Sequence, residues 1–122
     1  MEILIIDDEP TIISTLIKSL NRWGYEARSA ENALDALKIL STDPVDLILL
    51  DVYLKETTAI ELIPKIKSIK PTVNIITMTG QTSRELELEI RSFGILYYMA
   101  KPIEIANLKS ILEHIDSRVI AQ

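Results

Sequence analysis

Three aspartates follow apolar runs of the sequence, where charged groups are costly to place together. Asp7 and Asp8 come directly after the first apolar run, and Asp51 comes directly after a later one. At a separation of about 5 Å and an effective dielectric constant near 20, each ionised pair would cost roughly 3 kcal/mol. Lys101 offers one compensating charge, and a hard divalent cation would offer two more. Because Mg²⁺ prefers oxygen ligands and often keeps open water positions, these residue types predict a Mg²⁺ site able to receive a phosphoryl group.

Each acidic residue also has a simpler explanation when it is taken alone. Acidic residues cap helix starts and interact favourably with the helix dipole, and we interpret Glu9 before Pro10 in this way. Asp8 alone could be a cap, and Asp51 alone could end any strand. The combination is harder to attribute to chance, because acids, hydroxyls and a lysine fall at four separate strand ends.

The elements that must position these groups are short apolar strands. Two of the runs are nearly continuous, which is typical of central parallel strands covered on both faces. The segment 25–28 alternates and is polar, so we expect it at a sheet edge. The predicted strands cover residues 3–6, 25–28, 47–50, 73–76 and 95–99.

Apolar residues at helical spacing fill the intervals between these strands. Pro10 suits a first helical turn, and Gly94 suits a helix C-terminus. Pro64 is expected to kink a helix that begins near Thr58, or to mark an irregular start. The predicted apolar stripes are Ile12, Ile13, Leu16, Ile17 and Leu20; Ala30, Ala33, Leu34 and Leu37; Ile60, Ile63, Ile66 and Lys67 to Ile69; Leu86, Ile90 and Phe93; and Ile105, Leu108, Leu112, Ile115 and Val119.

Strand and helix therefore alternate five times, which predicts an α/β fold with a parallel sheet and right-handed crossovers. In such sheets, function collects at the carboxyl ends of the strands. In the strand order 2-1-3-4-5, the first and third strands are neighbours, which would bring all three aspartates together. Thr77 and Thr79 then follow the fourth run, and Lys101 follows the fifth, all at the same end of the sheet.

Composition narrows the classes of function. The chain has 122 residues, a single-domain length, so we expect one domain over residues 1–122 with no output domain in this chain. Its net charge of −5 argues against direct nucleic-acid binding and against a polybasic membrane surface. It has no cysteine for disulfide or thiolate chemistry. No signal peptide or bilayer-length apolar segment is visible, so we expect a cytoplasmic protein.

The pattern resembles the receiver domain of two-component response regulators over essentially the whole length. The resemblance implies a flavodoxin-like, doubly wound sheet of five parallel strands in the order 2-1-3-4-5, with five helices. The positions that carry it are Asp7-Asp8 after the first strand, Asp51 after the third, Thr79 after the fourth and Lys101-Pro102 after the fifth.

The resemblance also implies a reaction. Asp51 would accept a phosphoryl group from a phosphohistidine on a sensor histidine kinase or a phosphotransfer protein. Asp8 would bind Mg²⁺ directly and Asp7 through water, with Asp51 and the backbone carbonyl of Tyr53 completing the protein ligands. The domain would catalyse its own phosphorylation and dephosphorylation instead of acting on outside substrates, and no organic cofactor is expected.

The remaining implied roles concern the switch. Lys101 would contact one phosphoryl oxygen, and Thr79 would hydrogen-bond another after phosphorylation. Tyr98 fits the family's switch aromatic and would move inward behind Thr79. A downstream effector would then read the surface made by the fourth helix, the fifth strand and the fifth helix.

Several positions depart from the family pattern and leave alternatives open. Lys55 and Ala59 stand where the family commonly has Pro and Gly, which keeps open a receiver-like interaction module that works without phosphorylation. The bulky Tyr53 lies on the expected path to the phosphoryl group. Leu96 and Tyr97 replace acids that support a charged dimer interface in many DNA-binding members. These two residues either pack on the sheet or form a binding surface, and a homodimer stays open.

Two other classes of function fit the sequence less well. A flavodoxin-like cofactor protein is disfavoured because the chain has only three glycines and no glycine-rich phosphate loop. A metal-dependent phosphatase could use the acids, but no general acid is apparent outside the cluster.

Overall fold

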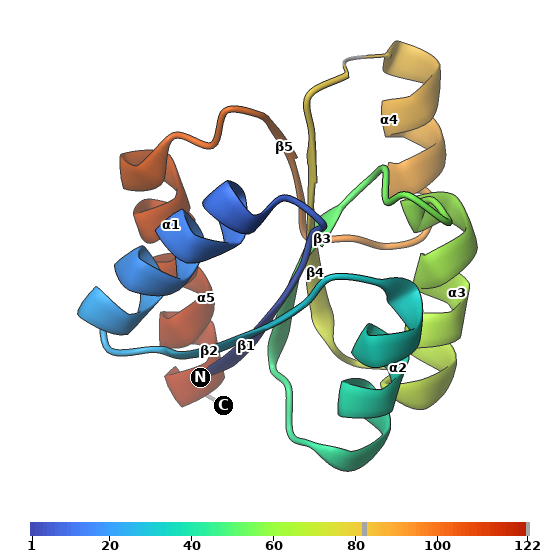
Figure 1. The fold of residues 1–122 in the computed structure, drawn as a ribbon. Helices are drawn as coiled ribbons and strands as arrows, with labels where there is room; N and C mark the ends of the chain where they lie inside the picture. The colour runs from blue at the N-terminus through green and yellow to red at the C-terminus, as the bar shows by residue number, and fades with distance from the viewer. Residues whose placement is uncertain (82, 122) are drawn as a thin grey trace.

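A computed structural model describes residues 1–81 and 83–121, apart from the side chains of residues 118–121. In this part of the chain, strands and helices alternate five times, and all the strands pair in parallel in the order β2-β1-β3-β4-β5, as predicted. Helices α1 and α5 cover one face of the sheet, and α2, α3 and α4 cover the other (Figure 1). The elements are β1 (Glu2–Ile6), α1 (Pro10–Arg22), β2 (Glu26–Ala30), α2 (Ala33–Thr42), β3 (Leu47–Asp51), α3 (Ala59–Ile69), β4 (Asn74–Thr79), α4 (Arg84–Arg91), β5 (Tyr97–Ala100) and α5 (Ile105–Ala121).

The central strands β1 and β3 are buried on both faces because each separates two apolar cores. Ile3 and Ile5 pack with α1 and α5, whereas Leu4 and Ile6 pack with α2 and α3. The side chains of residues 47–50 are likewise fully buried. A continuous apolar run is therefore what this sheet position requires, and the polar, alternating β2 lies at the edge, as expected.

The predicted stripe of the second helix was right at Ala33 and Leu37, which pack against the core, and wrong at Ala30 and Leu34. Ala30 ends β2, and the helix begins at Ala33 after Asn32, whose side chain accepts a hydrogen bond from the Asp35 amide. That start turns Ala36 toward the core, one helical turn before the buried Leu40. Leu34 consequently points outward, with an exposed fraction of 64%.

The other helices agree more closely with the sequence pattern. Helix α3 starts after Thr58 and continues through Pro64, whose exposed position leaves Leu62, Ile63 and Ile66 free to pack on the sheet. Helix α4 ends at Arg91, and Gly94 adopts a φ of 78° beyond it, where a residue without Cβ is favoured.

The predicted stripe of α5 is buried at Leu108, Leu112 and Ile115, while the side chain of Val119 lies outside the described residues. Within the described part of the chain, no helix combines the length and apolar character needed to cross a membrane.

Candidate functional site

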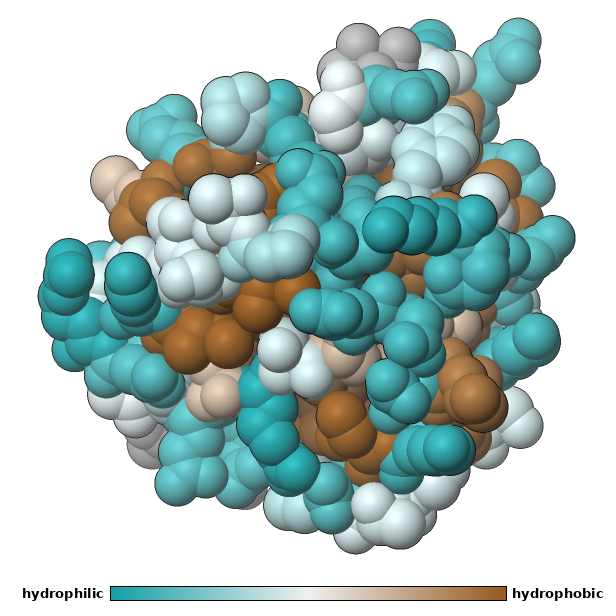
Figure 2. All heavy atoms as spheres, viewed as in Figure 1, coloured by the Kyte–Doolittle hydropathy of each residue, from teal (hydrophilic) through white to brown (hydrophobic). Residues whose placement is uncertain are grey.

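The predicted polar residues meet at the carboxyl ends of the strands. Ile6 of β1 pairs with Leu50 of β3, so Asp7 and Asp51, the residues that follow them, lie side by side. Thr79 ends β4, and its carbonyl accepts a hydrogen bond from the Lys101 amide at 2.8 Å. In the space-filling view, hydrophilic side chains cover the region between α1 and α3 where these strand ends meet (Figure 2).

Lys101 links the two buried aspartates. Its Nζ lies 2.9 Å from Asp7 Oδ2 and 3.2 Å from Asp51 Oδ2. The exposed fractions of Asp7 and Asp51 are 0% and 5%. Ion pairs in such a setting are weakly screened by solvent, so the ammonium group is positioned firmly between the carboxylates.

The acidic cluster contains one more member than predicted. Asp7, Asp8, Glu9 and Asp51 each offer a carboxylate oxygen, and these oxygens lie within 4.8 Å of one another. Glu9 occupies the N-cap position of α1, but its side chain makes no capping hydrogen bond. Instead its Oε1 lies 3.6 Å from the Lys101 Nζ. Our interpretation of Glu9 as a helix cap was wrong, and its place directly after Asp8 was the available signal.

The electrostatics of the site favour the binding of a cation. Burial first, and the nearby Asp7 carboxylate second, raise the pKa of Asp51 above its ordinary value, although Lys101 acts in the opposite direction. Burial also works to lower the pKa of the Lys101 ammonium group. Its contacts with Asp7 and Asp51 outweigh that effect, and the pKa of Lys101 is raised. One lysine is therefore not enough to balance the carboxylates around it.

The residues of the expected switch lie on the side of the sheet covered by α3 and α4. The Thr79 hydroxyl donates a hydrogen bond to the Gln81 carbonyl at 3.1 Å and accepts one from the Gln81 amide at 3.0 Å. The ring of Tyr98 is half-buried, and the Arg91 guanidinium lies 5.9 Å from its centroid. Burial, and then the charge of Glu87, raise the pKa of Tyr98, so its hydroxyl keeps its proton at neutral pH.

The loop after Asp51 is ordered by its own hydrogen bonds, without the family's Pro and Gly. Tyr53 and Thr58 form an antiparallel bridge, and the Leu54 amide donates to the Thr57 carbonyl at 3.0 Å. The Tyr53 amide also donates to Asp51 Oδ1 at 3.3 Å, while 40% of the Tyr53 residue stays exposed. The loop therefore presents a backbone amide to Asp51, while Tyr53 is partly exposed.

The loop after Asp51 is also hydrogen-bonded to the start of helix α2. Glu56 Oε1 accepts a hydrogen bond from the Ala33 amide at the first turn of α2, at 2.8 Å. Free amides and the helix dipole make this end of a helix a favourable place for a carboxylate. Sequence reasoning missed Glu56, because nothing in the pattern connects two residues 23 positions apart.

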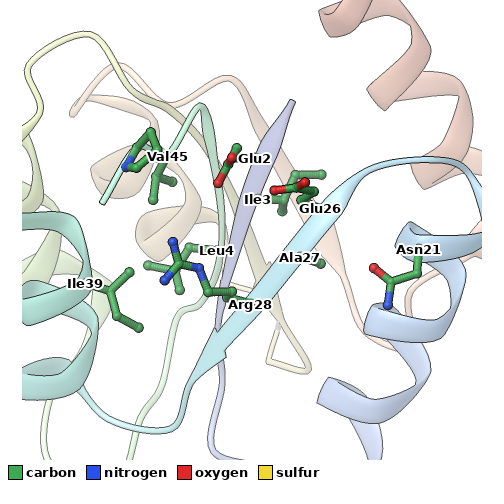
Figure 3. A pocket seen from close by; sticks show the side chains of 10 residues that line it. Glu2, Ile3, Leu4, Asn21, Glu26, Ala27, Arg28, Ile39 and Val45 are labelled. Carbon is green, nitrogen blue, oxygen red and sulfur yellow. The ribbon is translucent and has the colours of Figure 1, made fainter. Parts of the chain in front are cut away.

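The other residues singled out in the sequence have structural roles. Leu96 and Tyr97 are half-buried and pack against the core on the α1 and α5 side, in agreement with the packing alternative. A hollow of about 530 Å³ lies near the amino ends of β1 and β2, with Glu2, Glu26 and Arg28 in its lining (Figure 3). It is at the opposite end of the sheet from the acidic cluster.

A doubly wound sheet with an acidic cluster and a lysine at its carboxyl end defines a receiver-like class, and comparisons with known proteins agree. The family model of the response regulator receiver domain matches residues 3–113. Transcriptional regulatory protein ZraR of Escherichia coli K12 is 32% identical over 113 residues, which are 93% of this chain and 26% of that protein. Sporulation initiation phosphotransferase F of Bacillus subtilis is 31% identical over 112 residues, which are 92% of this chain and 90% of that protein.

A solved structure gives the same assignment. A response regulator from Burkholderia pseudomallei, solved with a phosphorylated aspartic acid, a calcium ion and citrate, is 29% identical. Its TM-score is 0.85 over 98% of this chain and 71% of that one.

The chain belongs to the receiver domain family of response regulators. Receiver domains as a family interact with histidine kinases or phosphotransfer proteins. As a member of this family, the chain is a phosphorylation-activated signalling switch. It spans about a quarter of the length of the ZraR relative, at 26%.

Proposed function

We propose that Asp51 is the phosphoacceptor of this switch. The observation that carries the proposal is the convergence on Asp51 of the Lys101 ammonium group, at 3.2 Å, and of the carboxylates of Asp7, Asp8 and Glu9. An acceptor needs a charge-neutralising partner at a fixed distance more than it needs covalent help. The Burkholderia pseudomallei relative, with its phosphorylated aspartic acid, supports the same chemistry here.

The donor set fits Mg²⁺. The cluster holds four carboxylates, and the one ammonium group that contacts three of them leaves most of their negative charge without a partner. All are hard oxygen ligands, which Mg²⁺ prefers. In our proposal Asp7, Asp8 and Asp51 hold the ion together with the backbone carbonyl of Tyr53. When bound, the ion would neutralise charge on the transferring phosphoryl oxygens.

Three residues of the chain, Asp51, Tyr53 and Lys101, have further roles in phosphoryl transfer. An Asp51 carboxylate oxygen forms a bond to phosphorus while the bond from phosphorus to the donor's imidazole nitrogen breaks, and the imidazole leaves with the bonding electron pair. The Tyr53 amide holds Asp51 through Oδ1. Lys101 exchanges part of its contact with the aspartates for a phosphoryl oxygen.

The product alters the other strand ends. The new phosphoryl charge attracts the Thr79 hydroxyl away from Gln81, and Tyr98 moves into the space behind it. The surface made by α4, β5 and α5 shifts its population and is read by a downstream effector. In this proposal the domain acts without direct contact to nucleic acid or membrane, and the cytoplasm stays the expected location. A homodimer stays one arrangement to be tested.

The test is transfer from a small phosphodonor in the presence of Mg²⁺, followed by mass spectrometry of the intact protein. We expect a gain of one phosphoryl group that is lost in Asp51→Asn and when the metal is chelated. Asp35→Asn, which changes an exposed aspartate on α2, is the matched control and should keep the gain. Equal labelling of the wild type and Asp51→Asn would refute the assignment of Asp51.

A further inference from the structure

Two buried hydroxyl groups of the described residues have no hydrogen-bond partner, and they are neighbours. These are Thr77 Oγ1 and Tyr98 Oη. Thr77 of β4 and Tyr98 of β5 are register partners in the parallel pair. Most buried polar atoms in folded proteins are paired, so two adjacent orphans require an explanation.

Both side chains project from the same face of the sheet. Ile76 and Met78 pack with α1 and α5, so the alternation of the strand turns Thr77 to the opposite face. Tyr98 packs against the core on that opposite face, under α3 and α4. The hydroxyl of Thr77 therefore lies between the sheet and the helices α3 and α4, where Tyr98 moves in the proposed switch.

The hydroxyl of Thr77 is costly in the conformation described here. Thr77 is fully buried, and a buried hydroxyl without a partner destabilises the conformation in which it is unpaired. A valine would fill the same volume without that cost. The Tyr98 ring is meanwhile held by Arg91, whose Nε is fixed by Glu87 Oε2 at 2.8 Å. In this conformation, neither the Thr77 hydroxyl nor the Tyr98 hydroxyl has a hydrogen-bond partner.

The position of Thr79 supplies that second state. It stands two residues after Thr77 on the same face of β4, and here its hydroxyl is engaged by the backbone of Gln81. When Thr79 turns to a phosphoryl group, room opens beside Thr77 on the side of β5.

We propose that Thr77 is a positioning residue of the switch, whose hydroxyl hydrogen-bonds to the inward-turned Tyr98 hydroxyl once Thr79 contacts the phosphoryl group. The inference rests on the proposed function of Asp51 and Thr79. Before phosphorylation, the two unpaired hydroxyls destabilise the protein. After phosphorylation, they form a hydrogen bond with each other. Both effects favour the phosphorylated state.

A double-mutant cycle with Thr77→Val and Tyr98→Phe tests this pairing. Beryllofluoride with Mg²⁺ serves as the phosphoryl mimic, and its affinity is measured by titration calorimetry. Loss of one hydrogen bond weakens binding by roughly threefold to tenfold, so each single variant should show that loss and the double variant no more than one of them. Urea unfolding without the mimic should show additive effects, with Thr77→Val more stable than the wild type.

Matched variants separate the pairing from general packing. Thr77→Ser keeps the hydroxyl and should retain more of the affinity than Thr77→Val. Tyr97→Phe, on the opposite face of β5, should show no coupling to Thr77→Val. Additive losses in the beryllofluoride cycle, or unchanged affinity in Thr77→Val, would overturn the pairing while leaving the function of Asp51 intact. Failure of the wild type to bind the mimic would overturn both proposals.

Discussion

The ammonium group of Lys101 lies between two carboxylates that are almost completely buried. It is itself only 11% exposed, and it contacts Asp7 and Asp51 at hydrogen-bond distance. Removing one member of a buried ion pair leaves the other charge uncompensated, which costs more than the pair contributes. The stability of the domain and the affinity of its site for cations are therefore linked through this residue.

Lys101→Met should destabilise the metal-free protein by about 3 kcal/mol, because Asp7 and Asp51 lose their countercharge. Urea unfolding measures the effect, and added Mg²⁺ should restore part of the loss. Lys65→Met, at an exposed lysine of α3, is the control and should change stability by less than about 0.5 kcal/mol. A loss that Mg²⁺ does not reduce would contradict a shared site for the lysine and the ion.

The raised pKa of Asp51 gives a pH dependence of defined sign. The folded protein holds a proton on Asp51 where the unfolded chain has released it, so this residue makes stability fall as the pH rises from the ordinary value of 3.8 through the raised pKa. Asp51→Asn should remove that fall and be more stable than the wild type at neutral pH, by about 1 kcal/mol. Urea midpoints with chelator across this range check the sign, and a less stable Asp51→Asn would reverse it.

Tyr53→Ala should shorten the lifetime of the acyl phosphate several-fold. The ring stands two residues beyond Asp51 and is partly exposed, so its removal opens a path for water. Loss of the phosphoryl group after donor removal gives the rate, with Tyr53→Phe as the variant that keeps the bulk. An unchanged rate in Tyr53→Ala would show that the ring does not shield the site.

The positions of single residues were predicted well where the ends of the strands define them. Asp7, Asp51 and Lys101 could be found because strand ends meet at one edge of a parallel sheet. Glu9 was misread because a helix start offers an acid two uses, a cap or a ligand, and only side-chain direction decides between them. The orphan hydroxyl of Thr77 could not be foreseen, since threonine in a strand is ordinary.

At the scale of elements, the loop between β3 and α3 shows how a family feature can be replaced. The bridge from Tyr53 to Thr58 and the tie from Glu56 to α2 fix a loop that has Lys55 and Ala59 where the family commonly has Pro and Gly. Local hydrogen bonds therefore supply the rigidity that backbone restriction supplies elsewhere.

Glu56→Ala should destabilise the protein by about 1 kcal/mol, since the Ala33 amide loses its partner at the start of α2. Phosphorylation by the small donor should also slow, because the Tyr53 carbonyl and amide are less firmly placed. Lys55→Ala, a neighbouring exposed change in the same loop, should leave both quantities near the wild-type values. Equal behaviour of the two variants would remove the positioning role of Glu56.

The order and type of the elements could be predicted, because β1 and β3 need continuous apolar runs and the helices need apolar stripes. Helix phase was less secure. Leu34 was predicted to lie in the core because the helical spacing was counted from Ala30. Ala30 belongs to the preceding strand and not to the helix. Pro64 looked disruptive, yet its solvent-facing position removes little packing.

At the scale of the whole molecule, the sheet order converts distant sequence positions into one site and connects that site to a surface. Thr79 lies at the end of β4, and Tyr98 lies on β5 beneath Arg91 of α4. A charge change at Asp51 can therefore reach α4 through two side chains. Helix α2 covers the same face of the sheet but packs near β2 and β1, toward the opposite edge from β5 (Figure 1).

Amide hydrogen exchange with and without Mg²⁺ and a small phosphodonor can show whether a change at Asp51 reaches α4 and β5. We expect changed exchange in the loop after β4, in α4 and in β5, with α2 little affected, and no change in Asp51→Asn. Unchanged exchange in α4 and β5 of a protein shown by its mass to be phosphorylated, or the same changes in Asp51→Asn, would contradict this expectation.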